Sequence, residues 1–249
     1  MDWLLNHAER YRSHIRSGPF FRRLARVERP SDLKWIHQLL HQSREFTQAL
    51  CLRYSLCHDT RYQRVFAEHA FQEVDHPDQL VAWMSKHGFL AGGETANLAA
   101  TPETLNSLAF CWRSAVRESH DVQVVSLNVL SEGVALDFYA AVIPVLEQLG
   151  LLNGRYWRVH REVDEHHLRL GLDECGDVAI DSPTGMLYQR VLWHAAGLYH
   201  QMLSSWVGVR VEPLAPLWSE NVSTGLLLEP PRPASVAQGT IRLNQSAKS

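Results

Sequence analysis

Several features are scarce or missing in this sequence of 249 residues, and each absence narrows the class of protein. Cysteines number only four and show no Cys-x-x-Cys spacing, so we expect reduced, buried thiols in a cytoplasmic protein. No apolar run of about 18 residues or more occurs, so we expect no membrane-spanning helix. Basic residues are not in excess, because the net charge is −3, and this leaves no electrostatic footprint for nucleic acid or for a membrane surface.

The remaining composition is that of a soluble globular protein. Hydrophobic residues make up 45% of the chain and charged residues 20%. The N-terminal stretch MDWLLNHAERYRSH carries charged residues too early for a signal peptide, which also favours the cytoplasm. We expect one domain over residues 1–227. Residues 228–249 contain proline and serine but few large apolar residues, which predicts a disordered tail.

Apolar residues recur at helical spacing along most of the chain, and convincing strand alternation is missing. Helix-start signals support this pattern, namely Ser31-Asp32, Thr101-Pro102 and Pro183. Pro77 should break or bend the helix in which it falls. The sequence therefore predicts an all-α bundle with helices over residues 2–17, 33–57, 60–76, 78–87, 101–119, 122–148, 153–171 and 184–207.

One short stretch carries the strongest chemical pattern, namely His160-Arg161-Glu162-Val163-Asp164-Glu165-His166-His167. In a helix, His160, Asp164 and His167 lie within about 60° of one another, so two imidazoles and a carboxylate share one face. Two nitrogen ligands and one oxygen ligand suit iron or manganese better than calcium or magnesium. The alternative is a solvated helix face that carries histidines by chance, since the chain has 14 of them.

Two further candidates lie earlier in the chain. Glu73 and His76 form the only Glu-x-x-His pair in the sequence, at i and i+3 on one helix face. The alternative is a helix end where His76 interacts with the last carbonyl groups. Glu132 interrupts an apolar helix, and a carboxylate there is rarely buried unless it is paired or bound to metal. The alternative places Glu132 on an exposed stripe with Ser131 and Asn128.

Together these positions offer three carboxylates and three imidazoles on three helices. This inventory suits two iron ions that keep open positions for O2 and substrate. The predicted metal ligands are Glu73, His76, Glu132, His160, Asp164 and His167.

The order of these motifs resembles the heme-oxygenase-like di-iron oxidases and oxygenases, a family related to the fatty-acid decarboxylases that make terminal alkenes and to amino-acid N-oxygenases. The segments that carry the resemblance are FQEVDHPDQLVAWMSKHGF, LSEGVALDFYAAVIPVLEQLG and YWRVHREVDEHHLRLGLD, and it spans residues 18–208. It implies a seven-helix bundle in which Glu73 and His76 supply one end of the site and Glu132 bridges. In a different register Glu68 would replace Glu73.

The resemblance also implies a function. We expect two Fe(2+) ions per chain and an O2-dependent oxidoreductase that acts on an amino acid or a fatty acid. The expected partners are O2 and a small-molecule substrate, with no nucleic acid and no membrane, and a homodimer stays an open alternative. Such chemistry needs a dry pocket. The aromatic residues that could wall it are Phe71, Phe138, Tyr139, Tyr156 and Trp157.

Two other classes of function stay open. One is a metal-free hydrolase of the same bundle, similar to thiaminase II, which would need Cys111 or Cys175 as its nucleophile. The other is a non-catalytic binding protein, in which the six positions would not converge.

Overall fold

The structure is a computed structural model that describes residues 1–90 and 99–218, except for the side chains of residues 161–165. Met1–Leu217 forms one compact unit. Of the remaining unit, Trp218–Ser249, only Trp218 is described, so the tail predicted over 228–249 lies outside the described residues.

The described part of the chain is helical and contains no strand. If α4 and α5 count as one interrupted helix, and α7, η2 and α8 as one continuous helix, the longer helices number seven, as predicted. The elements are α1 (Asp2–Arg16), α2 (Pro19–Leu24), η1 (Pro30–Asp32), α3 (Ile36–Leu56), α4 (Thr60–Glu73), α5 (His76–Lys86), α6 (Pro102–Arg117), α7 (His120–Gln123), η2 (Val124–Glu132), α8 (Gly133–Gln148), α9 (Arg155–Arg169) and α10 (Pro183–Trp206).

Local sequence signals set several of these helix ends. The Thr101 hydroxyl accepts a hydrogen bond from the Thr104 backbone N–H at 3.1 Å, which caps α6 ahead of its N-terminal proline. Ser182 caps α10 in the same way. Pro77 lies in the first turn of α5, so the predicted break falls between Glu73 and His76.

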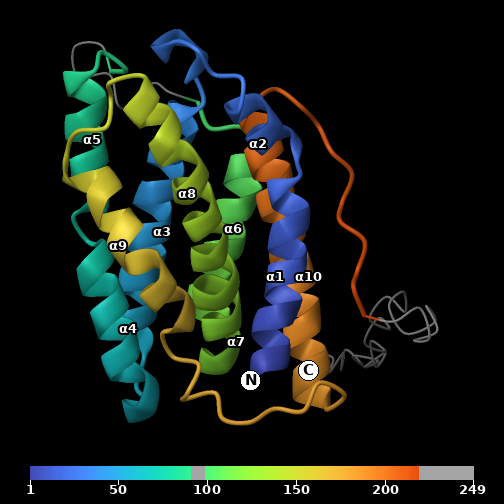
Figure 1. The fold of residues 1–249 in the computed structure, drawn as a ribbon. Helices are drawn as coiled ribbons and strands as arrows, with labels where there is room; N and C mark the ends of the chain where they lie inside the picture. Colours follow the sequence, from blue (N-terminus) through green and yellow to red (C-terminus); the bar gives the residue numbers. More distant parts are fainter. Residues whose placement is uncertain (91–98, 219–249) are drawn as a thin grey trace, which may run out of the picture. The chain divides into compact units, whose positions relative to one another are not determined.

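The helix formed by α7, η2 and α8 lies at the centre of the bundle (Figure 1). It packs against α1, α9 and α10, and its η2 part also contacts α6. The helices α4 and α5 lie beyond α9, and α3 packs against α4, α5 and α6. The segment η2 is a π-helix, in which backbone hydrogen bonds run from i to i+5 and widen the turn.

This central helix is also the one described helix that is long and apolar enough to cross a membrane. The most apolar stretch of His120–Gln148 is 67% buried inside the bundle, which is the position of a core helix. Its burial comes from packing against the surrounding helices, and buried residues such as Val125, Leu130 and Val142 belong to the main hydrophobic core.

Gly171 lies two residues after the end of α9, and we expect its substitution to destabilise the fold. Its φ is +90°, and an added Cβ would lie 2.9 Å from Val124 Cγ2. We expect Gly171→Ala to lower the free energy of unfolding by about 2–4 kcal/mol, from backbone strain and overpacking together. Gly150 is the matched control, because its φ is +69° but no atom lies within 4 Å of the added Cβ. Gly150→Ala should cost only about 1 kcal/mol in the same denaturant titration. Equal losses in the two variants would contradict the packing argument.

Candidate metal centre

Two groups of buried side chains could each hold a metal ion. The first contains His69, Glu73, Glu132 and His167, and the second contains Glu73, His76 and His160. Within each group the nitrogen and oxygen ligand atoms all lie within 4.8 Å of one another. Glu73 belongs to both groups, so the two groups share its carboxylate.

The α4 helix and the break after it position one wall of this centre. His69 and Glu73 are four residues apart and therefore lie on the same face of α4. The backbone carbonyl of Glu73, at the helix end, accepts a hydrogen bond from the Thr47 hydroxyl at 3.2 Å. His76 then starts α5 and places its Nδ1 2.7 Å from Glu73 Oε2.

Glu132 is the last residue of the π-helical segment η2, and it is buried. Its side chain is 4% exposed, and its Oε1 lies 2.8 Å from His69 Nε2. Ser131 and Asn128 are buried too, so the exposed stripe considered for these three residues is wrong. Because the surrounding helices cover every side of η2, a polar residue in this segment has to face other protein groups.

Two of the three residues predicted on α9 have described side chains. His160 is 6% exposed and His167 is fully buried, and they lie two turns apart on the side of α9 that faces the carboxylates. The His160 Nδ1–H donates to the Tyr156 backbone carbonyl at 2.8 Å. Asp164 lies in α9 between them, but its side chain lies outside the described residues.

Burial keeps most of the imidazoles neutral. It lowers the pKa of His69 to about 3, with the Arg53 guanidinium adding to the effect, and it lowers the pKa of His160 to about 4. The pKa of His167 is lowered too, chiefly by burial. For His76 burial is the largest single effect and acts to lower the pKa, but the hydrogen bond to Glu73 and the negative charges around the ring together outweigh it and raise the pKa. Neutral imidazoles are the form that binds metals.

The two carboxyl groups respond differently to the same surroundings. Burial raises the pKa of Glu132 to about 8, and the neighbouring Glu73 charge adds to the rise. Burial would also raise the pKa of Glu73, but the His76 hydrogen bond and the charges of nearby imidazoles lower it to about 2. Without a metal ion, Glu73 is therefore the ionised carboxylate of this pair.

One buried nitrogen atom in the centre, His167 Nδ1, has the properties of a metal ligand. His167 Nε2–H donates to Gln72 Oε1 at 2.6 Å, which leaves the lone pair on Nδ1. That Nδ1 is buried without a hydrogen-bond partner, 3.3 Å from Glu73 Oε1 and 3.9 Å from Glu132 Oε2. An unpaired buried acceptor between two carboxylates is unfavourable unless a cation binds there. Nitrogen and carboxylate donors together suit iron.

The arrangement differs from the sequence-based expectation in three ways. The carboxylate common to both groups is Glu73, whereas Glu132 was expected to bridge. Glu68, the alternative to Glu73, lies outside the cluster and contacts His166 on the surface at 2.8 Å. His69 was not predicted at all, although its spacing of four residues before Glu73 was a usable signal.

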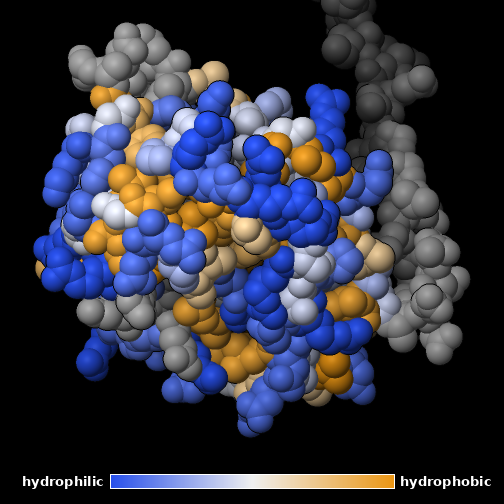
Figure 2. Space-filling view, turned by 45° about the horizontal axis from the view of Figure 1, so that its top comes forward, coloured by the Kyte–Doolittle hydropathy of each residue, from blue (hydrophilic) through white to orange (hydrophobic). Residues whose placement is uncertain are grey.

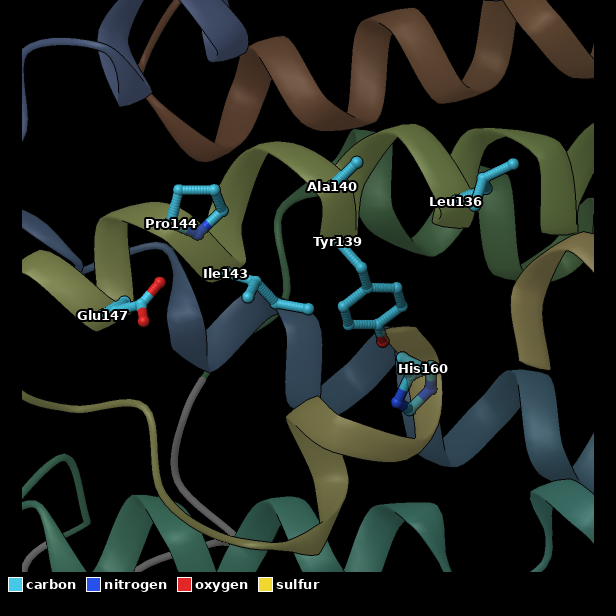
Figure 3. Close-up of a pocket in the computed structure, with 7 residues that line it drawn as sticks. All are labelled: Leu136, Tyr139, Ala140, Ile143, Pro144, Glu147 and His160. Atoms are coloured by element: carbon cyan, nitrogen blue, oxygen red, sulfur yellow. The ribbon is translucent and has the colours of Figure 1, made fainter. Parts of the chain in front are cut away.

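A groove on the outer side of α8 leads to this centre. It has a volume of about 280 Å³ and is lined by Leu136, Tyr139, Ala140, Ile143, Pro144, Glu147 and His160. Figure 3 shows Tyr139 pointing from α8 toward His160 on α9, and the two rings stack with centroids 4.0 Å apart. The Tyr139 hydroxyl lies 2.6 Å from the Tyr156 hydroxyl. The lining of the groove therefore includes a candidate metal ligand, His160, and the aromatic ring of Tyr139.

The other aromatic residues expected around a pocket lie elsewhere. Phe71 is 80% exposed on α4, and Phe138 packs in the core against Phe20 and Trp35. Figure 2 shows hydrophobic patches between hydrophilic regions of the surface, so apolar side chains reach the solvent in several places on that face.

Comparison with known proteins identifies the family. Residues 33–197 match the model of a family described as iron-containing redox enzymes, which is more than half of the chain. The chain belongs to this family. No curated protein matches it.

Two solved structures have the same fold as this member of the iron-containing redox enzyme family. A TenA homolog from Pseudomonas syringae pv. tomato has a TM-score of 0.66 at 12% identity, over 84% of this chain and 92% of that one. A domain of unknown function with a heme oxygenase-like fold, from Shewanella denitrificans, has a TM-score of 0.62 at 14% identity, over 80% of this chain and 88% of that one. The predicted heme-oxygenase-like all-α bundle is confirmed.

Proposed function

We propose that this protein is a cytoplasmic non-haem di-iron oxidase or oxygenase that uses O2 and acts on a small substrate bearing a carboxylate, such as an amino acid or a fatty acid. The observation that carries the proposal is the sharing of Glu73 between two groups of ligand atoms, beside an unpaired His167 Nδ1. Membership in a family of iron-containing redox enzymes supports iron as the metal.

In this proposal Glu73 would link two Fe(2+) ions. His167 and Glu132 would complete one position, and His76 and His160 the other; Asp164, the sixth predicted ligand, has its side chain outside the described residues. When bound, two ferrous ions can supply electrons for the reduction of O2. The protein contributes the fixed direction of each lone pair, because Gln72 holds His167 through Nε2 and the Tyr156 carbonyl holds His160 through Nδ1.

The surroundings of the centre also suit chemistry that must exclude water. Ala49, Leu50, Ala70, Cys111, Ala115 and Leu127 form a separate buried apolar cluster between α3, α4, α6 and η2. On the other side, Tyr139 and Tyr156 cover His160. A substrate in the groove would therefore approach the centre beside His160.

An anaerobic titration with Fe(2+), followed by rapid mixing with O2, tests the proposal. We expect about two ferrous ions per chain and a transient visible absorption band after mixing. His167→Gln should lose one ion, because an amide replaces the unpaired imidazole nitrogen. The absence of iron uptake by the reduced wild-type protein would overturn the proposal.

Filling the groove should separate substrate access from metal binding. Ala140 is exposed and lines the groove, so the larger side chain of Ala140→Trp can occupy the groove without displacing a buried residue. We expect KM for an active substrate to rise at least about tenfold, by loss of roughly 1.4 kcal/mol of binding free energy, while the iron content stays unchanged. Leu105→Trp is the matched control, since Leu105 is a 55% exposed residue on α6. An unchanged KM in Ala140→Trp would exclude this groove as the route.

The metal-free hydrolase is the second candidate, and the structural similarity to a TenA homolog favours it. The thiols argue against it. Burial raises the pKa of Cys111 to about 12, and burial likewise raises the pKa of Cys175 to about 12. A nucleophilic cysteine needs a lowered pKa and access to substrate, whereas Cys111 is fully buried.

A further inference from the structure

Behind the candidate metal centre lies a buried arginine without a carboxylate partner for its hydrogen bonds. Arg53 on α3 is 1% exposed. Its Nη1–H donates to Asn128 Oδ1 at 2.8 Å, and its Nη2 lies 2.9 Å from His69 Nδ1. Its guanidinium also lies over the Phe66 ring, 4.1 Å from the centroid. A buried guanidinium is normally paired with a carboxylate, so the hydrogen bonds of Arg53 to Asn128 and His69 need an explanation.

Arg53 fixes the orientation of the Asn128 amide. A guanidinium can only donate hydrogen bonds, so the Asn128 atom facing it has to be the carbonyl oxygen. The Asn128 amide nitrogen then faces the other way. It lies 2.9 Å from His69 Nδ1 and 3.1 Å from the backbone carbonyl oxygen of His167.

His69 Nδ1 therefore meets two donors, one from Arg53 and one from Asn128. A ring nitrogen that faces only donors has to be an acceptor and carries no proton. In a neutral imidazole the proton is then on Nε2. That Nε2 lies 2.8 Å from Glu132 Oε1, so His69 donates its proton to a hydrogen bond with this carboxylate.

The three other histidines of the centre each keep one ring nitrogen whose lone pair accepts no hydrogen bond from the described residues. His167 donates through Nε2 to Gln72 and keeps its lone pair on Nδ1, among the carboxylates. His160 donates a hydrogen bond from Nδ1 to the Tyr156 carbonyl, and His76 donates from Nδ1 to Glu73. In both rings the lone pair is therefore on Nε2. His69 and His76 each direct an N–H at a carboxylate, but His69 differs because its other ring nitrogen, Nδ1, already accepts from Arg53 and Asn128 and has no lone pair left for a metal ion.

We propose that His69 is a positioning residue and not a metal ligand: Arg53 and Asn128 fix its Nε2–H on Glu132 Oε1, which aims the other oxygen of Glu132 at the metal. This inference rests on the proposed function. Glu132 Oε2 is the oxygen nearer to His167 Nδ1, at 3.9 Å, so it is the one left for a shared ion.

Nuclear magnetic resonance of wild-type protein labelled with [15N]histidine tests the proton position directly. Zn²⁺ serves as the diamagnetic probe, and long-range 1H–15N correlations distinguish protonated, unprotonated and metal-bound nitrogens. The His69 signals are assigned by their loss in His69→Gln. We expect His69 to keep a protonated Nε2 and an unprotonated Nδ1 with and without Zn²⁺, while the His167 Nδ1 signal shifts on binding. A metal-bound shift at His69 Nε2 would overturn the inference.

Ferrous titrations of two glutamine variants provide the second test. The amide N–H of glutamine can replace the Nε2–H of His69, so His69→Gln should bind as many ions as the wild type with Kd raised less than about tenfold, the lower limit for outer-shell changes. His69→Leu removes the donor and should raise Kd by about 10–100-fold at the same ion count. His167→Gln is the ligand control and should lose an ion. Loss of an ion in His69→Gln would make His69 a ligand.

Failure of the proposed function has a different signature. If the wild type bound neither Fe(2+) nor Zn²⁺, the di-iron proposal would fail and Glu132 would have no ion to be aimed at. The spectrum of the metal-free protein would then still decide the position of the His69 proton. A protonated Nδ1 in that spectrum would overturn the hydrogen-bond assignment by itself.

Discussion

Glu73→Gln is expected to abolish high-affinity iron binding at both positions. Glu73 is the one residue common to the two groups of ligand atoms, and it is the carboxylate whose pKa is held at about 2. An amide has no negative charge and only one oxygen donor, so it binds an ion weakly and cannot serve both positions. We expect each Kd to rise by more than about 100-fold, beyond the range of outer-shell substitutions. Anaerobic titration with Fe(2+) against a competing chelator measures both constants.

Glu68→Gln is the matched control for this variant. Glu68 lies on the same helix five residues earlier, but its side chain is 36% exposed and contacts His166 on the surface. The same change of charge at this position should leave the iron count at two and the affinity close to that of the wild type. If instead Glu68→Gln lost iron and Glu73→Gln kept it, the register of the first ligand would be the alternative one.

Glu132→Gln is expected to stabilise the metal-free protein at pH 8 and to weaken its iron binding. Burial raises the pKa of Glu132 from its ordinary value near 4.5 to about 8 in the folded protein. Between these two values the folded state holds a proton that the unfolded state has released. Stability therefore falls as the pH rises from about 4.5 to about 8, by a total on the order of a few kcal/mol. Glutamine stays neutral and can still accept the hydrogen bond from His69, so this fall should disappear.

Thermal unfolding of the metal-free proteins between pH 5 and pH 8.5 measures this effect. The melting temperature of the wild type should fall relative to that of Glu132→Gln as the pH rises, and the two should converge toward the acid end of this range. Iron should reverse the order, because it replaces the proton on Glu132 in the wild type only. The iron affinity of the wild type should accordingly increase with pH up to about pH 8. Parallel pH profiles without metal would show that Glu132 is ionised in the folded protein throughout this range.

The sequence by itself determined the features of this protein that are local. Thr101-Pro102 and Ser182-Pro183 start helices because capping and proline geometry act within one turn. The spacing of His160 and His167 follows from the helical repeat of α9, and Glu73 and His76 stay close across the helix break because only two residues separate them, so both pairs could be recognised before their surroundings were known. The order of the three motifs indicated the fold and the iron chemistry, and the family match supports both.

Only the tertiary structure decided which atoms of different helices meet. The rotation of α4 against α9 and η2 places Glu73 in both groups and Glu68 on the surface, and no periodicity contains that rotation. Glu132 is buried beside His69 because the surrounding helices cover every side of η2, and the apolar sequence around it does not contain that packing. Arg53 comes from a third helix, 16 residues before His69. Local spacing fixes which residues share one helix face, whereas the packing of helices fixes which lone pairs point at a common centre.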